Sequence, residues 1–151
     1  MLRIRPVENE ETLRDARFVR RRVFVEEQDV DPDLEWDGRD ERARLVVGYA
    51  DDGNPVATAR WRAATHDEEL VAKLERFAVL PAHRGRGYGR RLVEVVTEDA
   101  RQAGFRVHVL HAQRQVEAFY AALGFQTIGE PFTEAGIPHV KMIRRVTDTN
   151  E

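Results

Sequence analysis

Hydrophobic and polar residues alternate over residues 2–7, LRIRPV, and this period of two predicts a strand. The next apolar positions recur at the spacing of one helical face, at Leu13, Ala16, Val19 and Val23. Residues 26–41, EEQDVDPDLEWDGRDE, are acidic and are interrupted by proline and glycine. Because both residues break regular structure, we expect a loop or a broken helix there.

Three strands are predicted in the middle of the chain. Residues 43–50, ARLVVGYA, and residues 55–64, PVATARWRAA, flank the turn sequence DDGN. Two such stretches around an Asp/Gly/Asn turn are typical of an antiparallel hairpin. Residues 70–79 form a further apolar-rich stretch of strand length.

A long helix is predicted over residues 86–103. Gly104 follows its last apolar position and is a typical helix terminator. The apolar residues at helical spacing are Tyr88, Leu92, Val96, Ala100 and Ala103.

The remaining residues predict a strand at 106–110, RVHVL, a short helix that ends at Gly124, and a closing strand at 139–146, HVKMIRRV. The apolar residues of the short helix are Val116, Phe119, Tyr120 and Leu123. Strands and helices that alternate in this order predict an α/β protein, a mixed sheet covered by helices.

Composition limits the domain count and the partners. A chain of 151 residues with 42% hydrophobic residues can build one substantial core, so we predict one domain over residues 1–146 and a short flexible tail, residues 147–151. The formal net charge of −3 comes from 27 acidic and 24 basic residues spread along the whole chain. Without a basic stripe, no nucleic-acid partner is expected.

The absence of cysteine excludes a disulfide framework, a thiolate metal site and a cysteine nucleophile. His108, His111 and His139 lack the spacing of a metal site, so no metal is expected. No apolar run approaches the roughly 20 residues of a membrane-spanning helix, and residues 1–12 lack the apolar core of a signal peptide. We therefore expect a soluble cytoplasmic protein with no membrane partner.

Gly85, Gly87 and Gly89 stand just before the predicted long helix. Without Cβ atoms, backbone N–H groups can approach an anion, and the helix amino terminus adds partial positive charge. A P-loop would need Lys and Ser or Thr after the last glycine, and a dinucleotide-binding fingerprint would need glycine where Arg90 stands. Both nucleotide motifs fail, which leaves a phosphate cradle or a flexible turn without a ligand.

Residues 84–89, RGRGYG, resemble the Arg/Gln-x-x-Gly-x-Gly/Ala signature of the GNAT acetyltransferase superfamily. Residues 79–104 are similar to the family's strand, pyrophosphate loop and long helix, and residues 117–125, EAFYAALGF, to its second hallmark helix. Residues 20–30, RRRVFVEEQDV, and residues 134–142, EAGIPHVKM, resemble the ElaA-like branch in particular.

The resemblance implies an acyl-CoA N-acyltransferase fold, a mixed and mostly antiparallel sheet that is splayed and flanked by helices. It also implies that acetyl-CoA binds in the splay, with pyrophosphate on the loop at residues 84–89 and pantetheine beside Phe77 and Val79. Gln113 stands where many members carry asparagine, and its amide can make the same contact. The cofactor-binding residues implied in this way are Phe77, Ala78, Val79, Arg84, Gly85, Arg86, Gly87, Tyr88, Gly89, Arg90, Gln113, Phe119 and Tyr120.

Acetyl transfer to an amine makes two demands on protons. The attacking amine must be unprotonated although a free alkylamine titrates near pH ~10.4, so a base or a desolvating channel is required. The departing thiolate benefits from a proton, and in the resembled family a tyrosine at the position of Tyr120 reaches the cofactor sulfur. We predict Tyr120 as the general acid, with a core aromatic as the alternative. Glu75 is predicted either as a base, direct or through water, or as a solvent-facing strand residue.

Acidic residues crowd residues 26–41, where the resembled fold builds its acceptor wall, and such a wall would attract a cationic amine. A charged, solvated loop is the alternative for most of them. His139 either lines the acceptor side or satisfies a strand hydrogen bond. The predicted substrate-binding residues are Glu27, Glu35, Asp37 and His139.

These observations predict an acetyl-CoA-dependent N-acetyltransferase that moves the acetyl group directly to a primary amine of a small molecule or peptide. The alternative is a non-catalytic acyl-CoA-binding or scaffold module with the same fold, and the phenol of Tyr120 favours the enzyme. The sequence leaves the identity of the amine open, and also whether the chain forms a homodimer.

Overall fold

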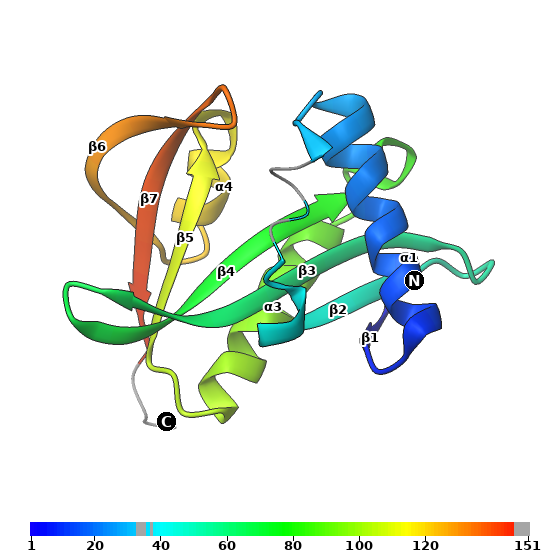
Figure 1. Ribbon diagram of the computed structural model, residues 1–151, viewed down its shortest axis with the longest axis horizontal. Helices are drawn as coiled ribbons and strands as arrows, with labels where there is room; N and C mark the ends of the chain where they lie inside the picture. Colours follow the sequence, from blue (N-terminus) through cyan, green and yellow to red (C-terminus); the bar gives the residue numbers. More distant parts are fainter. Residues whose placement is uncertain (33–35, 37, 147–151) are drawn as a thin grey trace.

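Seven strands form one sheet in the computed structural model, which describes residues 1–32, 36 and 38–146. The strands are β1 (Arg3–Pro6), β2 (Ala43–Tyr49), β3 (Pro55–His66), β4 (Glu69–Val79), β5 (Val107–Gln113), β6 (Gln126–Glu134) and β7 (Ile137–Arg145). Their order across the sheet is β1-β2-β3-β4-β5-β7-β6, and only β4 and β5 run parallel (Figure 1). The prediction of a mixed, mostly antiparallel sheet is confirmed.

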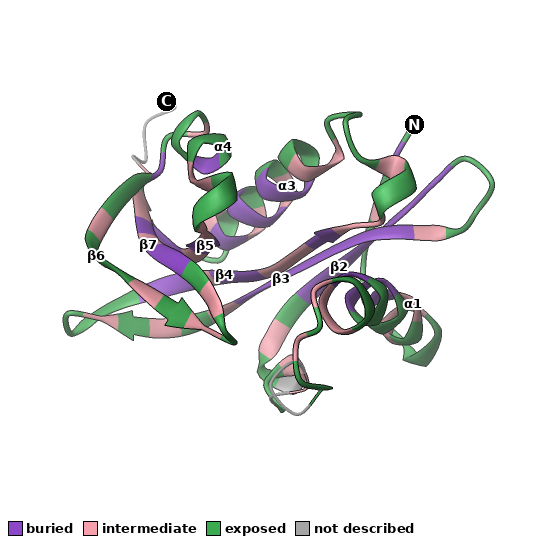
Figure 2. Cartoon of the chain, turned by 90° about the horizontal axis from the view of Figure 1, so that it is seen from above, coloured by how far each residue is buried: buried purple, intermediate pink, exposed green. Residues whose placement is uncertain are grey.

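Helices cover both faces of the sheet, with α3 and α4 on one face and α1 on the other (Figure 2). The helical segments are α1 (Glu10–Arg20), η1 (Arg21–Glu27), η2 (Asp40–Arg42), η3 (Pro81–His83), α3 (Tyr88–Gln102), η4 (Arg114–Val116) and α4 (Glu117–Ala121). The main core packs α3 against the sheet, and a smaller cluster around Ala16 and Val47 lies under α1. Burial of these apolar faces is the main force that holds the helices to the sheet.

The first helix changes its winding at Arg21. Residues 10–20 are α-helical, and η1 continues them as a π-helix over Arg21–Glu27. Ala16, Val19 and Val23 are buried, as their helical spacing predicted. Because a π-helical segment inserts extra residues into a turn, it re-aims the side chains at the end of η1, and such segments occur often at functional sites.

The sheet divides between β4 and β5. These strands pair at Ala72 with His108, Lys73 with Val109 and Leu74 with Leu110, and no register pair between them follows in the described chain. A bulge in β4 accompanies the separation, since the register against β3 shifts between Thr58 and Arg60, and Arg76 has a positive φ of 60°. Bulges bend strands and increase their twist, so this one steers the end of β4 away from β5.

Several predicted boundaries moved. The long helix begins at Tyr88 and not at residue 86, because Gly85 and Gly87 have positive φ angles of 79° and 80°. The strand predicted at residues 106–110 runs on to Gln113 as β5. Glu35, Asp37 and the predicted tail at residues 147–151 lie outside the described residues. Among the helices that are described, none combines the length and apolar character needed to cross a membrane.

Candidate active site

A cleft of about 860 Å³ opens where β4 and β5 separate, between the glycine loop, α4 and η1. Nearly all of the predicted site residues that the structure describes line it, and Arg86 is the exception. The lining residues among them are Glu27, Glu75, Phe77, Ala78, Val79, Arg84, Gly85, Gly87, Tyr88, Gly89, Arg90, Gln113, Phe119, Tyr120 and His139. Sequence segments more than 100 residues apart are thus brought to one cavity.

The glycine loop owes its glycines to backbone conformation. Gly85 and Gly87 adopt left-handed φ angles, and a Cβ built at either position meets nothing within 4 Å. Gly87 is the N-cap of α3 and provides no side-chain cap, so the first N–H groups of this helix have no side-chain acceptor there. The loop therefore leaves open space in front of a positively polarised helix end. Within the loop, the backbone N–H of Arg84 already has an acceptor, since it donates to the Pro81 carbonyl oxygen at 3.3 Å.

Arg84 and Glu27 pair with each other across the cleft mouth. The two guanidinium nitrogens of Arg84 lie 2.8 and 2.7 Å from the two carboxylate oxygens of Glu27, and Arg84 Nε donates to the Val79 carbonyl oxygen at 2.9 Å. The hydrogen bond from Arg84 holds the pKa of Glu27 below its ordinary value. The carboxylate of Glu27 is thus already neutralised, which argues against its predicted attraction for a cationic amine.

Gln113 makes a second bridge to the end of η1. Its Nε2 donates to Gln28 Oε1 at 2.9 Å, and its Oε1 accepts from Gln115 Nε2 at 2.9 Å. Together with the Arg84–Glu27 pair, this bond ties the C-terminal end of the π-helix to both sides of the separated sheet. The amide of Gln113 is engaged at both ends in this structure.

Tyr120 lies in the wall of the cleft and is held by aromatic rings. Its ring centroid is 6.0 Å from that of Phe77, 5.0 Å from that of Phe119 and 6.1 Å from that of Phe125. The residue is 8% exposed, and burial raises the pKa of its phenol. No described residue forms a hydrogen bond with the hydroxyl. Such a phenol stays protonated at neutral pH and has its donor unused.

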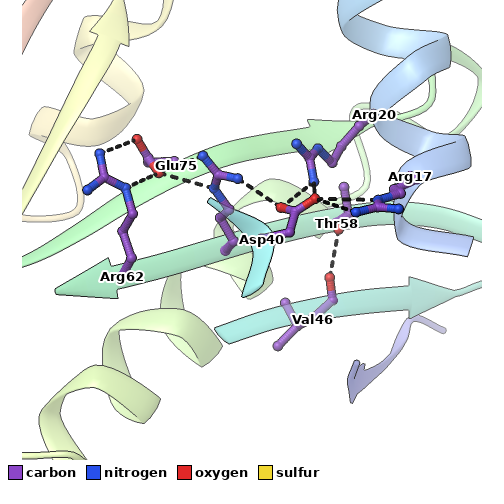
Figure 3. A network of polar contacts seen from close by, with 8 residues as sticks. Arg17, Arg20, Asp40, Val46, Thr58, Arg62 and Glu75 are labelled. Atoms are coloured by element: carbon purple, nitrogen blue, oxygen red, sulfur yellow. Dashed lines mark hydrogen bonds and ion pairs between the residues drawn. The ribbon is translucent and has the colours of Figure 1, made fainter. Parts of the chain in front are cut away.

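Glu75 is the centre of a buried ionic network on β3 and β4 (Figure 3). Its Oε1 lies 2.9 Å from Arg60 Nη2 and 2.9 Å from Arg62 Nε, and its Oε2 lies 3.5 Å from Lys73 Nζ. Burial alone would raise the pKa of Glu75, but the three cations outweigh it and hold the pKa at about 2. A carboxylate so strongly stabilised in its charged form is a weak proton acceptor, which argues against Glu75 as the base.

The network continues to Asp40, which lies near the end of the acidic segment, residues 26–41. Its Oδ1 lies 2.8 Å from Arg20 Nη1 and 2.8 Å from Arg60 Nη1, and Arg17 approaches its Oδ2 at 3.3 Å. Arg20 and Arg60 are each 1% exposed at the side chain. The acidic character of residues 26–41 therefore does not create a negative wall at Glu27 or Asp40, because arginines neutralise both.

Two further titratable residues line the cleft. His111 on β5 makes a 2.8 Å contact from Nδ1 to Glu134 Oε1 on β6, and this bond holds the pKa of Glu134 below its ordinary value. His139 Nδ1 contacts the Ile137 carbonyl oxygen at 2.7 Å, and its ring stacks on Phe132. Sequence reasoning missed Glu134 and the role of His111, because their juxtaposition depends on the pairing of three strands.

No group of three His, Asp or Glu side chains in the described part of the chain could hold a metal ion. The cleft instead combines a protonated phenol, a helix end with open space and a histidine–carboxylate pair. This combination suits acyl transfer between two substrates, one on each side of the separated strands.

The chain belongs to the acetyltransferase (GNAT) family, whose model matches residues 10–125. It is 37% identical over 137 residues to the uncharacterized N-acetyltransferase YjcF of Bacillus subtilis, covering 90% of this chain and 94% of that protein. The crystal structure of an acyl-CoA N-acyltransferase from Pseudomonas aeruginosa matches with a TM-score of 0.83 and 27% identity, over 95% of this chain and 99% of that chain.

The crystal structure of Escherichia coli ElaA matches with a TM-score of 0.81 and 28% identity, over 96% of this chain and 100% of that chain. The predicted GNAT fold and the resemblance to ElaA are confirmed.

Proposed function

We propose that this protein transfers an acetyl group from acetyl-CoA directly to a primary amine of a small molecule or peptide, and that Tyr120 protonates the leaving thiolate. The environment of Tyr120 carries the proposal. A buried phenol with no hydrogen-bond partner among the described residues, in the wall of the cleft between two diverging strands of one sheet, has a clear use as a proton donor.

The fit of acyl-CoA is supported by the backbone. Beyond Leu74 and Leu110 the facing edges of β4 and β5 have no register pairs with each other, so their amide groups are available to an extended chain such as pantetheine. The glycine loop offers open space and helix N–H groups to a pyrophosphate. The Pseudomonas relative is named for acyl-CoA, which agrees with this assignment.

The reaction needs two proton movements. The amine nitrogen forms a bond to the thioester carbonyl carbon, the carbon–sulfur bond breaks, and the sulfur takes the proton from Tyr120 Oη. The amine loses a proton, and His111 is suited to accept it, since a proton on Nδ1 facing Glu134 leaves the lone pair on Nε2. His111 then releases its proton to solvent and Tyr120 regains one from solvent, so the atoms and charges balance.

The decisive experiment measures thiol release from acetyl-CoA with a panel of amines for the parent and for Tyr120→Phe. The ring keeps its packing, so we expect acetyl-CoA affinity by calorimetry to stay unchanged while kcat falls about 100-fold to 10,000-fold. Tyr49→Phe is the control, because the Tyr49 hydroxyl donates to Asp15 at 2.6 Å outside the cleft and should leave kcat unchanged. Full kcat in Tyr120→Phe, or no acetylation by the parent, contradicts the proposal.

A further inference from the structure

A second pocket of about 380 Å³ adjoins the cleft, and the two share Arg39, Lys73 and His111 as lining residues. The register pairs Arg62 with Lys73, Lys73 with Val109 and His111 with Lys141 bring side chains of four strands together. The pocket is lined by Arg39, Arg62, Ala64, Thr65, His66, Val71, Lys73, Val109, His111 and Lys141.

This basic pocket contains more positive than negative charge. Arg62, Lys73 and Lys141 line it, whereas no Asp or Glu of the described chain does. Arg62 and Lys73 share the carboxylate of Glu75, which also pairs with Arg60. The two pocket-lining cations of this network, Arg62 and Lys73, thus share one carboxylate, which leaves positive charge in excess at the pocket.

Lys141 has no carboxylate partner among the described residues. Its Nζ contacts His66 Nδ1 at 2.7 Å, which uses one of its three donors on a neutral acceptor. His66 Nε2 in turn lies 3.4 Å from Asp67, a side chain that is 89% exposed. Lys141 therefore presents charge and unused donors to the pocket.

Lys73 adds a second cation that is costly to leave unmatched. Its side chain is 20% exposed, and burial together with the nearby Arg62 outweighs Glu75 and Glu134 in lowering its pKa. A negative group placed between Lys73 and Lys141 would relieve this cost and accept charge-assisted hydrogen bonds from both. The apolar side chains Ala64, Val71 and Val109 complete the pocket and suit only a compact group.

We propose that the basic pocket binds an oxyanion carried by the acceptor, so that the amine substrate is an anionic amine of amino-acid size. This inference rests on the proposed function, and it names the substrate class of the same site. His111 and Lys141 lie directly opposite each other on β5 and β7, a spacing of about 5 Å between Cβ atoms. Both residues line the basic pocket, so one molecule can present its amine to His111 and its oxyanion to Lys141.

A cationic amine was expected from an acidic wall at Glu27 and its neighbours. Glu27 is instead paired with Arg84, and Lys73 and Lys141 bring positive charge to the basic pocket. A diamine or polyamine would meet Lys73 and Lys141 as like charges. A carboxylate and a phosphate share the chemistry that the pocket recognises, and matched substrates separate these two sources.

The kinetic test compares amines that differ in one charge. We expect kcat/KM for β-alanine or phosphoethanolamine to exceed that for β-alaninamide or ethanolamine by about 10-fold or more. The pair with the larger ratio identifies carboxylate or phosphate as the preferred oxyanion. Lys141→Met should abolish this preference, whereas Lys141→Arg should retain it.

Arg145→Met is the matched control, since Arg145 is a cation of the same strand that pairs with Glu69 outside both pockets. It should keep the full preference for anionic amines. Equal use by the parent of amines with and without an oxyanion, or an undiminished preference in Lys141→Met, overturns the anionic-acceptor inference while the proposed acetyl transfer stands.

An equilibrium test is independent of turnover. Inorganic phosphate, compared with chloride at equal ionic strength and with CoA saturating, should raise the melting temperature of the parent and of Arg145→Met, and much less that of Lys141→Met. An equal rise in Lys141→Met overturns the oxyanion pocket. A Lys141-dependent rise without acetylation of any amine supports the pocket and contradicts the proposed function, so the two failures are distinguishable.

Discussion

The two sides of the cleft are built in different ways. The proposed cofactor side comes from two short stretches of chain, residues 77–90 and 113–120, and it depends on backbone conformation and aromatic packing. The proposed acceptor side comes from β3, β4, β5 and β7. Its charged residues are held by ion pairs between residues far apart in sequence, and this network reaches α1 and η2. Local sequence therefore encodes the site that we propose for acetyl-CoA, and tertiary pairing encodes the site that we propose for the acceptor.

The two sides also differ in whether their residues serve ligand binding or the stability of the fold. The glycine loop leaves open space at Gly85 and Gly87, so its geometry serves a ligand more than the core. The Arg60 network is buried in the sheet, where each charge needs its partner for the fold itself. The largest stability effects should therefore come from the acceptor side.

The strongest test of this contrast is Arg60→Met. Arg60 joins Asp40 at 2.8 Å and Glu75 at 2.9 Å, and its removal leaves each buried carboxylate with one partner fewer. We expect a loss of about 3–5 kcal/mol in the free energy of unfolding, measured by urea denaturation. Arg145→Met breaks only an exposed pair and should cost less than about 1 kcal/mol. Similar losses in the two variants would remove the energetic distinction.

Acid should weaken the acceptor side first. The pKa of Glu75 is about 2 in the folded protein against an ordinary 4.5, so the unfolded chain takes up this proton at higher pH. The stabilisation is fully present above about pH 5 and is lost as the pH falls towards 2, with a loss of about 2 kcal/mol by pH 3.

The measurement is urea denaturation between pH 6 and pH 3. Glu75→Gln should remove this part of the pH dependence, whereas Glu69→Gln, at an exposed pair, should keep the slope of the parent. An unchanged slope in Glu75→Gln would show that other carboxylates control the acid response.

The smallest stability effect, with a specific loss of binding, is expected at the glycine loop. Gly87 and Gly53 have φ angles of 80° and 87°, and a Cβ at either meets nothing within 4 Å. Gly87→Glu and Gly53→Glu should therefore each cost about 1–2 kcal/mol of stability for the left-handed backbone. Only Gly87→Glu should weaken CoA binding, by about 10-fold or more in calorimetry, because its charge repels the pyrophosphate. Equal CoA affinities would locate the phosphates elsewhere.

Periodicity predicted the elements that have a clear apolar face. The strand at residues 70–79 and the long helix differ by at most two residues from β4 and α3. No range was predicted for β6, because most of its residues are exposed and it lies at the sheet edge, so its sequence carries little apolar periodicity. The π-helical winding of η1 was not predicted, because the four-residue spacing of the buried Val19 and Val23 is also that of an α-helical face.

The candidate site likewise has residues that local sequence predicted and contacts that only the tertiary structure reveals. Gly87 and Tyr120 were found from short motifs, and both line the cleft. The partners of Glu75 and the approach of Lys141 to His66 depend on strand register, and residues 60, 62, 75 and 141 carry no shared local pattern. Glu75 was therefore found as a candidate from its place two residues before Phe77. Its low pKa could not be inferred from the sequence, because it depends on Arg60, Arg62 and Lys73.

The short pairing between β4 and β5 has an evolutionary consequence. Only three register pairs join the two halves of the sheet, and their side chains at Ala72, Leu74 and Leu110 belong to the core. A change of side-chain volume at these positions alters the angle between the halves, because packed cores transmit such strain. Selection on interior residues can thus adjust the width of the opening while every group that touches a substrate stays the same.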